Sequence, residues 1–433
     1  MCSRRRSSNG CSRCTMALGN REGKEVTVDV FEKCHAFYAD PDVAEKMGYP
    51  ANPTRAKELG LYPFFIPLDH AEGTEIVIQG RRLIMLGSNN YLGLTMHPAV
   101  REAAQAAIGK YGTSCTGSRF LNGTLTLHCE LESRLASFLG KEDAIVFSTG
   151  YQTNLGVISS LLGRGDVVIC DKENHASILD GCRLSFGRML RYAHNDMQDL
   201  ERVLTAAPED AGKLLITDGV FSMSGEVAPL PEIVSLCEET NTRILLDDAH
   251  GIGVIGEGRG TAHAQGVSDK VDLLLGTFSK SLSSIGGYIA GSTEVIQWIR
   301  HLARSLIFSA SLPAPNVAAA LAALDIIEQE PERVVRVNEV ADRMRTGLRE
   351  LGFNVGQSVT PIIPVFIGDS LEALKVWRHL YDAGVYVNVA ISPAVPQGQA
   401  LLRISVMATH TEEQIEKSLH AFAAMGQAFG LTG

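Results

Sequence analysis

Short apolar runs alternate with helix-like segments through the middle of the chain, and this alternation limits the possible folds more than any other feature. Amphipathic stretches, such as residues 230–239, separate the apolar runs. Units of strand, helix and strand build a mainly parallel sheet covered by helices on both faces. The sequence therefore predicts an α/β fold with strands at 144–148, 167–170, 214–217, 244–247 and 273–277.

Segments on either side of this alternation indicate a second, smaller domain. A chain of 433 residues is longer than a typical domain with a single hydrophobic core. Residues 76–86 predict a hairpin that turns at Gly80, and residues 97–110 predict a helix. Beyond Pro315 we expect helices at 317–328, 332–351 and 412–429, and strands at 362–367 and 401–406.

This order divides the chain into four expected parts. We expect a disordered leader at 1–22, an N-terminal segment at 23–95 that joins the small domain, a large domain at 96–320, and the C-terminal part of the small domain at 321–433. Cys11 and Cys14 form a lone C-x-x-C pair in the leader without further ligands at metal-site spacing, so we expect no metal. Met16 is a second candidate for the start of the protein.

Charge and apolar content argue against several classes of protein. Lys and Arg total 39, Asp and Glu total 49, and the formal net charge is −10. This balance disfavours a nucleic-acid-binding surface. Prolines, serines and Asn316 interrupt the nearest candidate for a membrane span, residues 306–327, so we expect no span. The first fifteen residues lack the apolar core of a secretory signal, and the nine cysteines are scattered, which favours a cytoplasmic protein.

Lys280 is the strongest single candidate for a catalytic group. It lies in the run GTFSKS (276–281), directly after the apolar run VDLLL. A lysine at the end of a buried strand is poorly solvated, so its amine loses a proton more easily and can form a Schiff base. A surface loop lysine with hydroxyl neighbours is the alternative reading of this segment alone.

Asp247 and His250 end another apolar run, ILLDDAH (244–250). The carboxyl ends of strands are the places where open α/β sheets bind ligands. A carboxylate there could keep a heterocyclic nitrogen protonated, as pyridoxal phosphate requires. The alternative is an aspartate that caps a helix and a histidine that packs in the core.

The next residues, GIGVIG (251–256), spell the glycine pattern of a dinucleotide-binding turn. That pattern places its glycines directly where a strand turns into a helix. Here residues 247–250 occupy the turn, and EGRG (257–260) continues as a loop. We therefore do not expect a dinucleotide.

Three further strand ends carry polar residues. STGYQTN (148–154) runs from a strand into a helix, whose first backbone N–H groups can bind a phosphate. His175, in NHAS (174–177), could stack on a cofactor ring, and Ser222, in DGVFSM (218–223), could bind a phenolic oxygen. Each has a plainer reading, namely a helix cap, a packed histidine or a hydroxyl bonded in its own turn. Together with Lys280 and Asp247, however, they supply every part of a pyridoxal phosphate site.

The ordered set of motifs resembles the α-oxoamine synthases, which are pyridoxal phosphate enzymes of fold type I. The resemblance covers residue 61 to the end and implies a large domain with a seven-stranded, mainly parallel sheet and a smaller α+β domain built from both terminal parts. GSRFLNGT (117–124), DGCRLSF (180–186) and RISVMATHT (403–411) look most like the soluble bacterial serine palmitoyltransferases. The other motifs are SNNYLG (88–93), FSTGYQTN, NHAS, DGVFSM, LDDAHGIGVIGEGRG and GTFSKS.

The resemblance implies a role for each matching residue. Lys280 matches the lysine that binds pyridoxal phosphate covalently, Asp247 the acid at the ring nitrogen, and His175 the stacking imidazole. His250 and Ser222 match the groups near the phenolic oxygen, and Arg403 the arginine that holds the substrate carboxylate. The remaining matches are Gly150, Tyr151 and Thr277 at the phosphate, Ser309 reaching the phosphate from the neighbouring subunit, and Asn89 on the substrate side.

The implied activity is a decarboxylating condensation of L-serine with a long-chain acyl thioester by a homodimer whose sites are shared between subunits. The resemblance leaves alternatives open: an 8-amino-7-oxononanoate synthase, a glycine-using relative, or a secondary-metabolite synthase. It also leaves the donor open, because the acidic chain and the long segment before residue 61 are compatible with coenzyme A or an acyl carrier protein. A catalytically inactive regulatory subunit is disfavoured because Lys280, Asp247 and His175 are all present.

Overall fold

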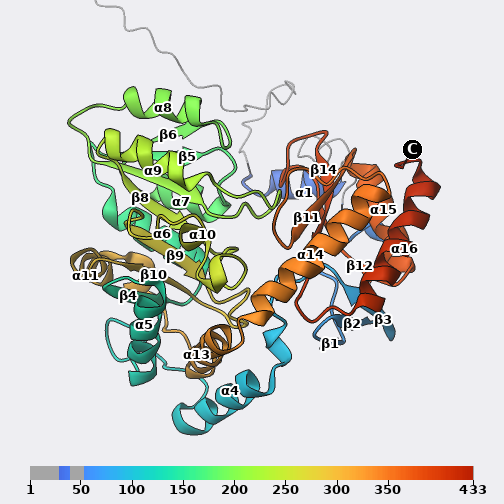
Figure 1. Cartoon of the computed structure of the whole chain (residues 1–433), viewed down its shortest axis with the longest axis horizontal. Helices are drawn as coiled ribbons and strands as arrows, with labels where there is room; N and C mark the ends of the chain where they lie inside the picture. Colours follow the sequence, from blue (N-terminus) through green and yellow to red (C-terminus); the bar gives the residue numbers. More distant parts are fainter. Residues whose placement is uncertain (1–28, 40–52, 433) are drawn as a thin grey trace, which may run out of the picture.

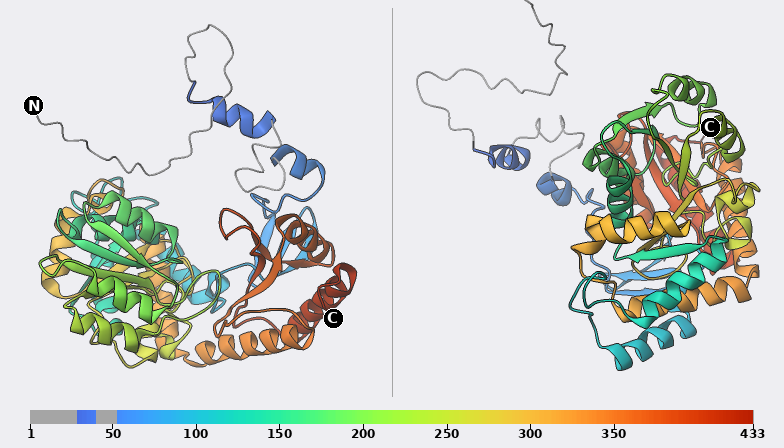
Figure 2. Two further views of the ribbon diagram at one scale, coloured as in Figure 1. Left: turned by 90° about the horizontal axis from the view of Figure 1, so that it is seen from above. Right: turned by 90° about the vertical axis from the view of Figure 1, so that its left-hand side faces the viewer.

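Two bodies, joined by the long helix α14 (Glu332–Glu350), make up the described part of the protein (Figures 1 and 2). The computed structural model describes residues 29–39 and 53–432. The expected leader at 1–22, with Cys11, Cys14 and Met16, lies outside the described residues. None of the helices in the described ranges has the length and hydropathy that a membrane crossing needs.

A seven-stranded sheet forms the centre of the larger body. Its strand order is β4–β10–β9–β8–β7–β5–β6, and all strands run parallel except β10, which is antiparallel to both neighbours. This confirms the predicted fold class. The bounds are β4 (Asp143–Phe147), β5 (Val167–Asp171), β6 (Arg188–Tyr192), β7 (Lys213–Asp218), β8 (Arg243–Asp247), β9 (Leu273–Thr277) and β10 (Gly287–Gly291).

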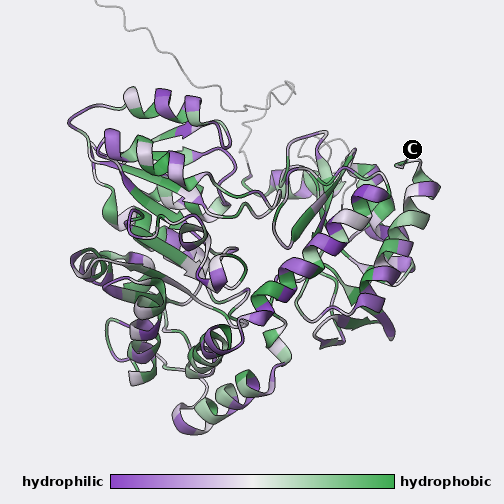
Figure 3. Cartoon of the chain, viewed as in Figure 1, coloured by the Kyte–Doolittle hydropathy of each residue, from purple (hydrophilic) through white to green (hydrophobic). Residues whose placement is uncertain are grey.

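Helices cover both faces of this sheet, so the strands are apolar on both sides (Figure 3). Successive side chains of β5 alternate between two cores, with Val168 in one and Ile169 in the other. One face carries α6 (Gly150–Leu161), α7 (Ala176–Leu184), α11 (Thr293–Leu302) and α12 (Arg304–Ile307). The other carries α4 (Pro98–Tyr111), α5 (Thr126–Leu139), α8 (Met197–Thr205), α9 (Leu230–Glu239), α10 (Thr261–Ala264) and α13 (Ala314–Gln329).

The smaller body combines residues from both ends of the chain in one core. Ile76 and Leu83 pack with Trp377 and Phe422. One of its sheets has the order β1 (His70–Glu72), β2 (Glu75–Ile78), β3 (Arg81–Met85), β12 (Val385–Tyr386), and the other β11 (Ile362–Gly368), β14 (Ala400–Ser405), β13 (Asn388–Ala390). The helices of the smaller body are α15 (Ser370–Asp382) and α16 (Glu412–Phe429). The described chain also contains α1 (Glu32–Ala39), α3 (Pro53–Glu58), η1 (Leu94–Met96) and η2 (Gly256–Gly258), of which η1 and η2 pack against α4 and α10 in the larger body.

We propose that the limit between the two bodies lies near residue 330. Helix α13 continues past residue 320, where we expected the large domain to end, and packs against α4 in the larger body. From there the chain runs along α14 into the C-terminal part of the smaller body. We therefore place the boundary at Glu330, and the division into domains stays a proposal.

Candidate active site

Most of the predicted residues meet at the carboxyl ends of the parallel strands, where they line a pocket of about 300 Å³. At this edge each parallel strand turns into a helix. The turns present side chains and backbone N–H groups that are not used in the hydrogen bonds of the sheet. The lining residues from the prediction are Gly150, Tyr151, His175, Asp247, His250, Thr277 and Lys280.

Lys280 lies just beyond β9 and enters the pocket beside several carboxylates. Burial lowers the pKa of its amine to about 8, although the charges of Asp247 and Asp218 act in the opposite direction. A substantial fraction of the amine is therefore neutral near neutral pH, as a nucleophile or base requires.

Asp247, at the end of β8, is buried and held by two donors. The amide Nδ2 of Asn154 donates to its Oδ2 at 2.7 Å, and the N–H of Ala249 donates to its Oδ1 at 3.1 Å. Nδ2 of Asn154 also donates to the hydroxyl of Ser177 at 2.9 Å. These bonds fix the carboxylate at the deep end of the pocket, where it can face a protonated ring nitrogen.

Asp218 is a second buried acid that the sequence did not single out. It lies beside Asp247 in the ladder between β7 and β8, and its carboxylate accepts the backbone N–H of His175 at 2.7 Å. Burial, followed by the charge of Asp247, raises the pKa of Asp218 well above its usual value. This bond holds the start of α7, and with it the imidazole of His175, over the pocket.

His250 is buried on the other side of the pocket and is neutral. Its Nδ1 lies 2.7 Å from the phenol oxygen of Tyr91. Burial lowers the pKa of His250 well below its usual value, and the charges of Lys280 and Arg403 lower it further. The prediction missed Tyr91. Its phenol hydroxyl also donates a hydrogen bond to Oδ1 of Asn89 at 3.3 Å, so Tyr91 connects His250 to Asn89.

A helix N-terminus closes the end of the pocket opposite Asp247. Thr149 caps α6 by accepting the N–H of Gln152, which leaves other first-turn N–H groups free for an anion. A Cβ on Gly150 would lie 2.9 Å from Oγ1 of Thr277, so only glycine fits there. Oγ1 of Thr277 lies 2.6 Å from the hydroxyl of Ser279, another pocket residue. This cradle fits a phosphate group.

Arg403, on β14, contacts Asn89, the other residue that was predicted to bind the substrate. Its Nη1 donates to Oδ1 of Asn89 at 3.0 Å and to the hydroxyl of Ser405 at 2.7 Å. Its Nε donates to the backbone carbonyl of Ser222. Asn89, Ser222 and Arg403 are thus together, although none of them lines the pocket itself.

Three predicted residues differ from expectation in what they contact. Ser222 is connected through its carbonyl to Arg403, whereas we expected its hydroxyl to serve a phenolic oxygen. The phenol of Tyr151 donates to Asp180 and turns toward α7. Ser309 accepts a hydrogen bond from Nε2 of Gln152 at 3.2 Å and does not line the pocket.

The glycines of GIGVIG serve loop packing. A Cβ on Gly251 would lie 2.0 Å from Oδ1 of Asp248, and one on Gly253 would lie 2.5 Å from Cβ of Ser281. Asp248 is buried and accepts the N–H and hydroxyl of Thr261, both at 2.6 Å. The glycine pattern therefore reflects a tight loop around a buried carboxylate, in agreement with the rejection of a dinucleotide turn.

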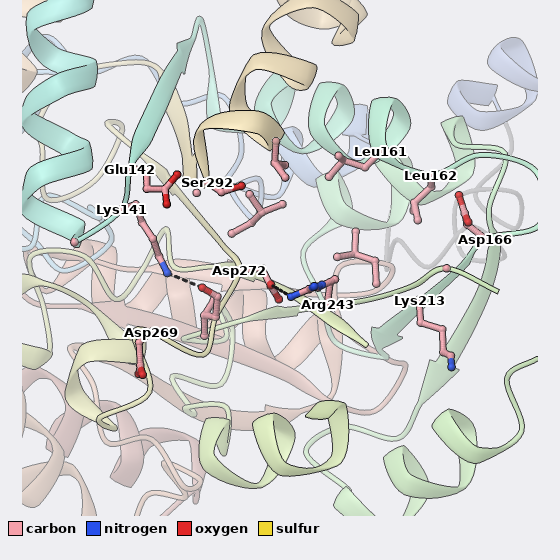
Figure 4. A pocket seen from close by; sticks show the side chains of 17 residues that line it. Lys141, Glu142, Leu161, Leu162, Asp166, Lys213, Arg243, Asp269, Asp272 and Ser292 are labelled. Carbon is pink, nitrogen blue, oxygen red and sulfur yellow. Dashed lines mark hydrogen bonds and ion pairs between the residues drawn. The ribbon is translucent and has the colours of Figure 1, made fainter. Parts of the chain in front are cut away.

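A larger pocket, of about 720 Å³, lies at the opposite edge of the sheet (Figure 4). Its charged groups are already engaged: Lys141 donates to the carbonyls of Ser268 and Val271, and Arg243 pairs with Asp272. It offers no cradle comparable to the N-terminus of α6. We therefore assign the chemistry to the smaller pocket.

Comparison with known proteins agrees with this geometry. The family model "Aminotransferase class I and II" matches residues 81–422. A serine palmitoyltransferase of Sphingobacterium spiritivorum is 49% identical over 84% of this chain and 91% of its own length. An 8-amino-7-oxononanoate synthase of Geobacter sulfurreducens is 45% identical over 87% of this chain and 97% of its own length.

A solved structure shares the fold as well. The serine palmitoyltransferase of S. paucimobilis, bound to a pyridoxal phosphate–myriocin adduct, superposes with a TM-score of 0.88 at 38% identity and covers 93% of this chain and 100% of its own. Sequence, fold and the phosphate cradle opposite a buried carboxylate thus agree. The chain belongs to the α-oxoamine synthases, the pyridoxal phosphate-dependent acyltransferases of the aminotransferase class I and II family.

Proposed function

We propose that the protein condenses L-serine with a long-chain acyl thioester such as palmitoyl-CoA, with loss of carbon dioxide, to give 3-ketodihydrosphingosine. The observation that carries the proposal is the 49% identity to a serine palmitoyltransferase over 91% of that enzyme's length. This activity is the first step of sphingolipid synthesis.

The pocket residues support a division of labour. Pyridoxal phosphate supplies an electron sink at the substrate Cα when it is bound. Lys280 would hold the cofactor covalently, and Asp247, fixed by Asn154, would keep a proton on the ring nitrogen. His175 would cover the ring and His250 would serve the phenolic oxygen, whereas Ser222 acts on Arg403 through its carbonyl. The phosphate group would be held by the backbone N–H groups of Gly150 and Tyr151, by Thr277, and by Ser309 of the second subunit.

Arg403 and Asn89 bind the amino acid. The guanidinium fork of arginine holds a carboxylate in two-point geometry, and Asn89 and the carbonyl of Ser222 orient that fork. This placement directs the Cα–H bond of serine toward Lys280. With its pKa lowered to about 8, the freed amine of Lys280 then removes the Cα proton.

The remaining bonds follow from the substrates. Cα forms a bond to the acyl carbonyl carbon, and the thiolate leaves and takes up a proton from the solvent. The bond from Cα to the carboxylate breaks, carbon dioxide leaves, and Lys280 returns a proton to Cα. Water must be kept from the thioester throughout, which the burial of Tyr91 and His250 supports.

We further propose a cytoplasmic homodimer with active sites at the subunit interface. Support comes from three exposed apolar side chains, Phe120, Leu121 and Phe308, which are 52%, 77% and 73% exposed in the single chain. Light scattering of the holoenzyme tests the dimer. Parallel assays with palmitoyl-CoA and palmitoyl-acyl carrier protein decide the donor, for which we favour coenzyme A.

A spectral titration tests the amino-acid preference. Serine should change the visible absorption of the holoenzyme at lower concentration than alanine or glycine, and product should form best with a C16 thioester. The 45% identity to an 8-amino-7-oxononanoate synthase makes alanine with a pimeloyl thioester the second candidate. A response to alanine or glycine without one to serine would overturn the serine assignment.

A further inference from the structure

His194 bridges two carboxylates behind the active site. Its Nδ1 lies 3.0 Å from Oδ1 of Asp171, and its Nε2 lies 2.8 Å from Oε2 of Glu226. The ring also meets the edge of Phe221, with centroids 4.3 Å apart. His194 is mostly enclosed and Asp171 completely so, with side-chain exposures of 18% and 0%.

The geometry requires a charged imidazole. An ionised carboxylate only accepts hydrogen bonds, and a neutral imidazole donates from one nitrogen alone. Asp171 is fixed as an acceptor by two further donors, the backbone N–H groups of Glu173 and Asn195. His194 can satisfy Asp171 and Glu226 together only as an imidazolium, with a proton on each ring nitrogen.

Asp171 and Glu226 belong to the two loops that carry active-site groups. Asp171 ends β5 and begins the short segment that leads to His175. Glu226 lies in the loop after β7, where its carbonyl accepts the N–H of Phe221. The next residue, Ser222, gives its carbonyl to Arg403.

The loop after β7 has a second attachment, to the smaller body. The hydroxyl of Thr360 donates to the carbonyl of Gly225 at 3.0 Å. Without His194, the loop would be connected to the smaller body and to Arg403 but would lose its ionic connection to β5. The ionic bridge therefore sets the distance between the Ser222 carbonyl and the loop that carries His175.

We propose that His194 is a positioning residue for the amino-acid substrate: the ionic bridge Asp171–His194–Glu226 sets the distance between His175 and the Ser222 carbonyl that orients Arg403. This inference rests on the proposed function, in which Arg403 binds the serine carboxylate. Since the bridge does not reach the phosphate cradle, Asp247 or Lys280, which hold the cofactor at its two ends and covalently, we expect it to affect serine affinity far more than cofactor content.

Charge around His194 supports this role over the pH range of the enzyme. Burial alone lowers its pKa, but the hydrogen bond and charge of Asp171, the hydrogen bond of Glu226 and the charge of Glu173 outweigh burial and raise the pKa to about 9. The bridge is thus intact at neutral pH and is lost as the pH rises through about 9.

The test compares holoenzyme with His194→Gln, which is neutral and cannot donate to both carboxylates. We expect the serine dissociation constant, from the visible spectrum, to rise about tenfold, as for the loss of one charge-assisted hydrogen bond. Pyridoxal phosphate content should stay at the wild-type level. The affinity difference should shrink between pH 8 and 10, because wild type itself loses the imidazolium there. Glu226→Gln, which keeps an acceptor for Nε2 of His194 but removes the charge, should change serine affinity in the same direction by a smaller amount.

His420→Gln is the matched control, because that ring is exposed on α16 and bonds only the carbonyl of Glu416. Unchanged serine affinity in His194→Gln overturns the proposal. Equal losses of cofactor and serine affinity overturn it too, because they indicate general structural damage. If His194→Gln does not fold, Glu226→Gln decides by the same criteria. A wild-type enzyme that fails to respond to serine refutes the proposed function instead.

Discussion

The amide of Asn154 donates to the carboxylate of Asp247 across 93 residues of sequence, at 2.7 Å and in a buried environment. Asn154 lies one turn into α6, the helix whose N-terminus forms the phosphate cradle. One helix thus shapes both ends of the proposed cofactor site. A shift of α6 would change the phosphate contacts and the acid at the ring nitrogen together.

Asn154→Ala should weaken cofactor binding. Removing a hydrogen bond to a charged group costs about 1.5–3 kcal/mol, so we expect the pyridoxal phosphate dissociation constant to rise about 10- to 100-fold. Equilibrium dialysis followed by absorbance measures it. Asn338→Ala is the control, because Asn338 bonds only the carbonyls of Val254 and Val334. Equal affinity in Asn154→Ala and wild type would contradict this role.

Glu132→Ala should strongly destabilise the fold. Nη1 of Arg119 lies 2.7 Å from Oε1 of Glu132, with both side chains 5% exposed. Breaking such a pair leaves a buried charge without a partner and costs about 3–5 kcal/mol. Urea unfolding measures this loss. The control is Lys270→Ala, whose pair with Glu238 is about half exposed and therefore contributes little to stability. Similar unfolding midpoints for the two variants would rule out the assigned cost.

The sequence predicted the buried strands but missed two strands of the large sheet. β6 has the sequence RMLRY and lies at the sheet edge, so charged and half-exposed residues obscure its pattern. β10 begins and ends with glycine, which reads as a loop. Gly287 is needed because a Cβ there would lie 2.4 Å from Oγ1 of Thr153. Because α6 packs so closely against β10, the strand needs glycine at this position, and glycine hides the residue pattern that would indicate a strand.

Site residues at strand ends were predictable, because motif order and the rule of strand carboxyl ends place them together. Tyr91 and Asn154 were not, since their roles depend on which way a side chain points after folding. Tyr91 meets His250 across 159 residues, and no local pattern encodes that contact. Asp218 was visible in DGVFSM, but its pairing with the His175 backbone needs the register of β7 against β8.

Gly150→Ala should reduce the preference for a phosphorylated cofactor. The added Cβ would lie 2.9 Å from Oγ1 of Thr277, so the start of α6 must shift away from the cradle. We expect affinity for pyridoxal phosphate to fall about tenfold or more and affinity for pyridoxal, which lacks the phosphate, to change little. Gly109→Ala in α4 is the control, because nothing lies within 4 Å of its Cβ position. Equal losses for both cofactor forms would place the damage outside the phosphate cradle.

The lowered pKa of Lys280 predicts how the stability of the cofactor-free protein depends on pH. The amine titrates near pH 8 in the folded chain against an ordinary value of 10.5, because burial disfavours its charge. Between these values the unfolded chain binds the proton and the folded chain does not, so the stability contribution of Lys280 rises with pH. Lys280→Met has no proton to bind and should be more stable than wild type at pH 7. The difference in the free energy of unfolding should shrink by about 2–3 kcal/mol between pH 8 and 10, as measured by urea unfolding at each pH. A constant difference across that range would show that the folded lysine keeps its ordinary pKa, and the amine would then be almost fully protonated near neutral pH and unable to act as the base proposed here.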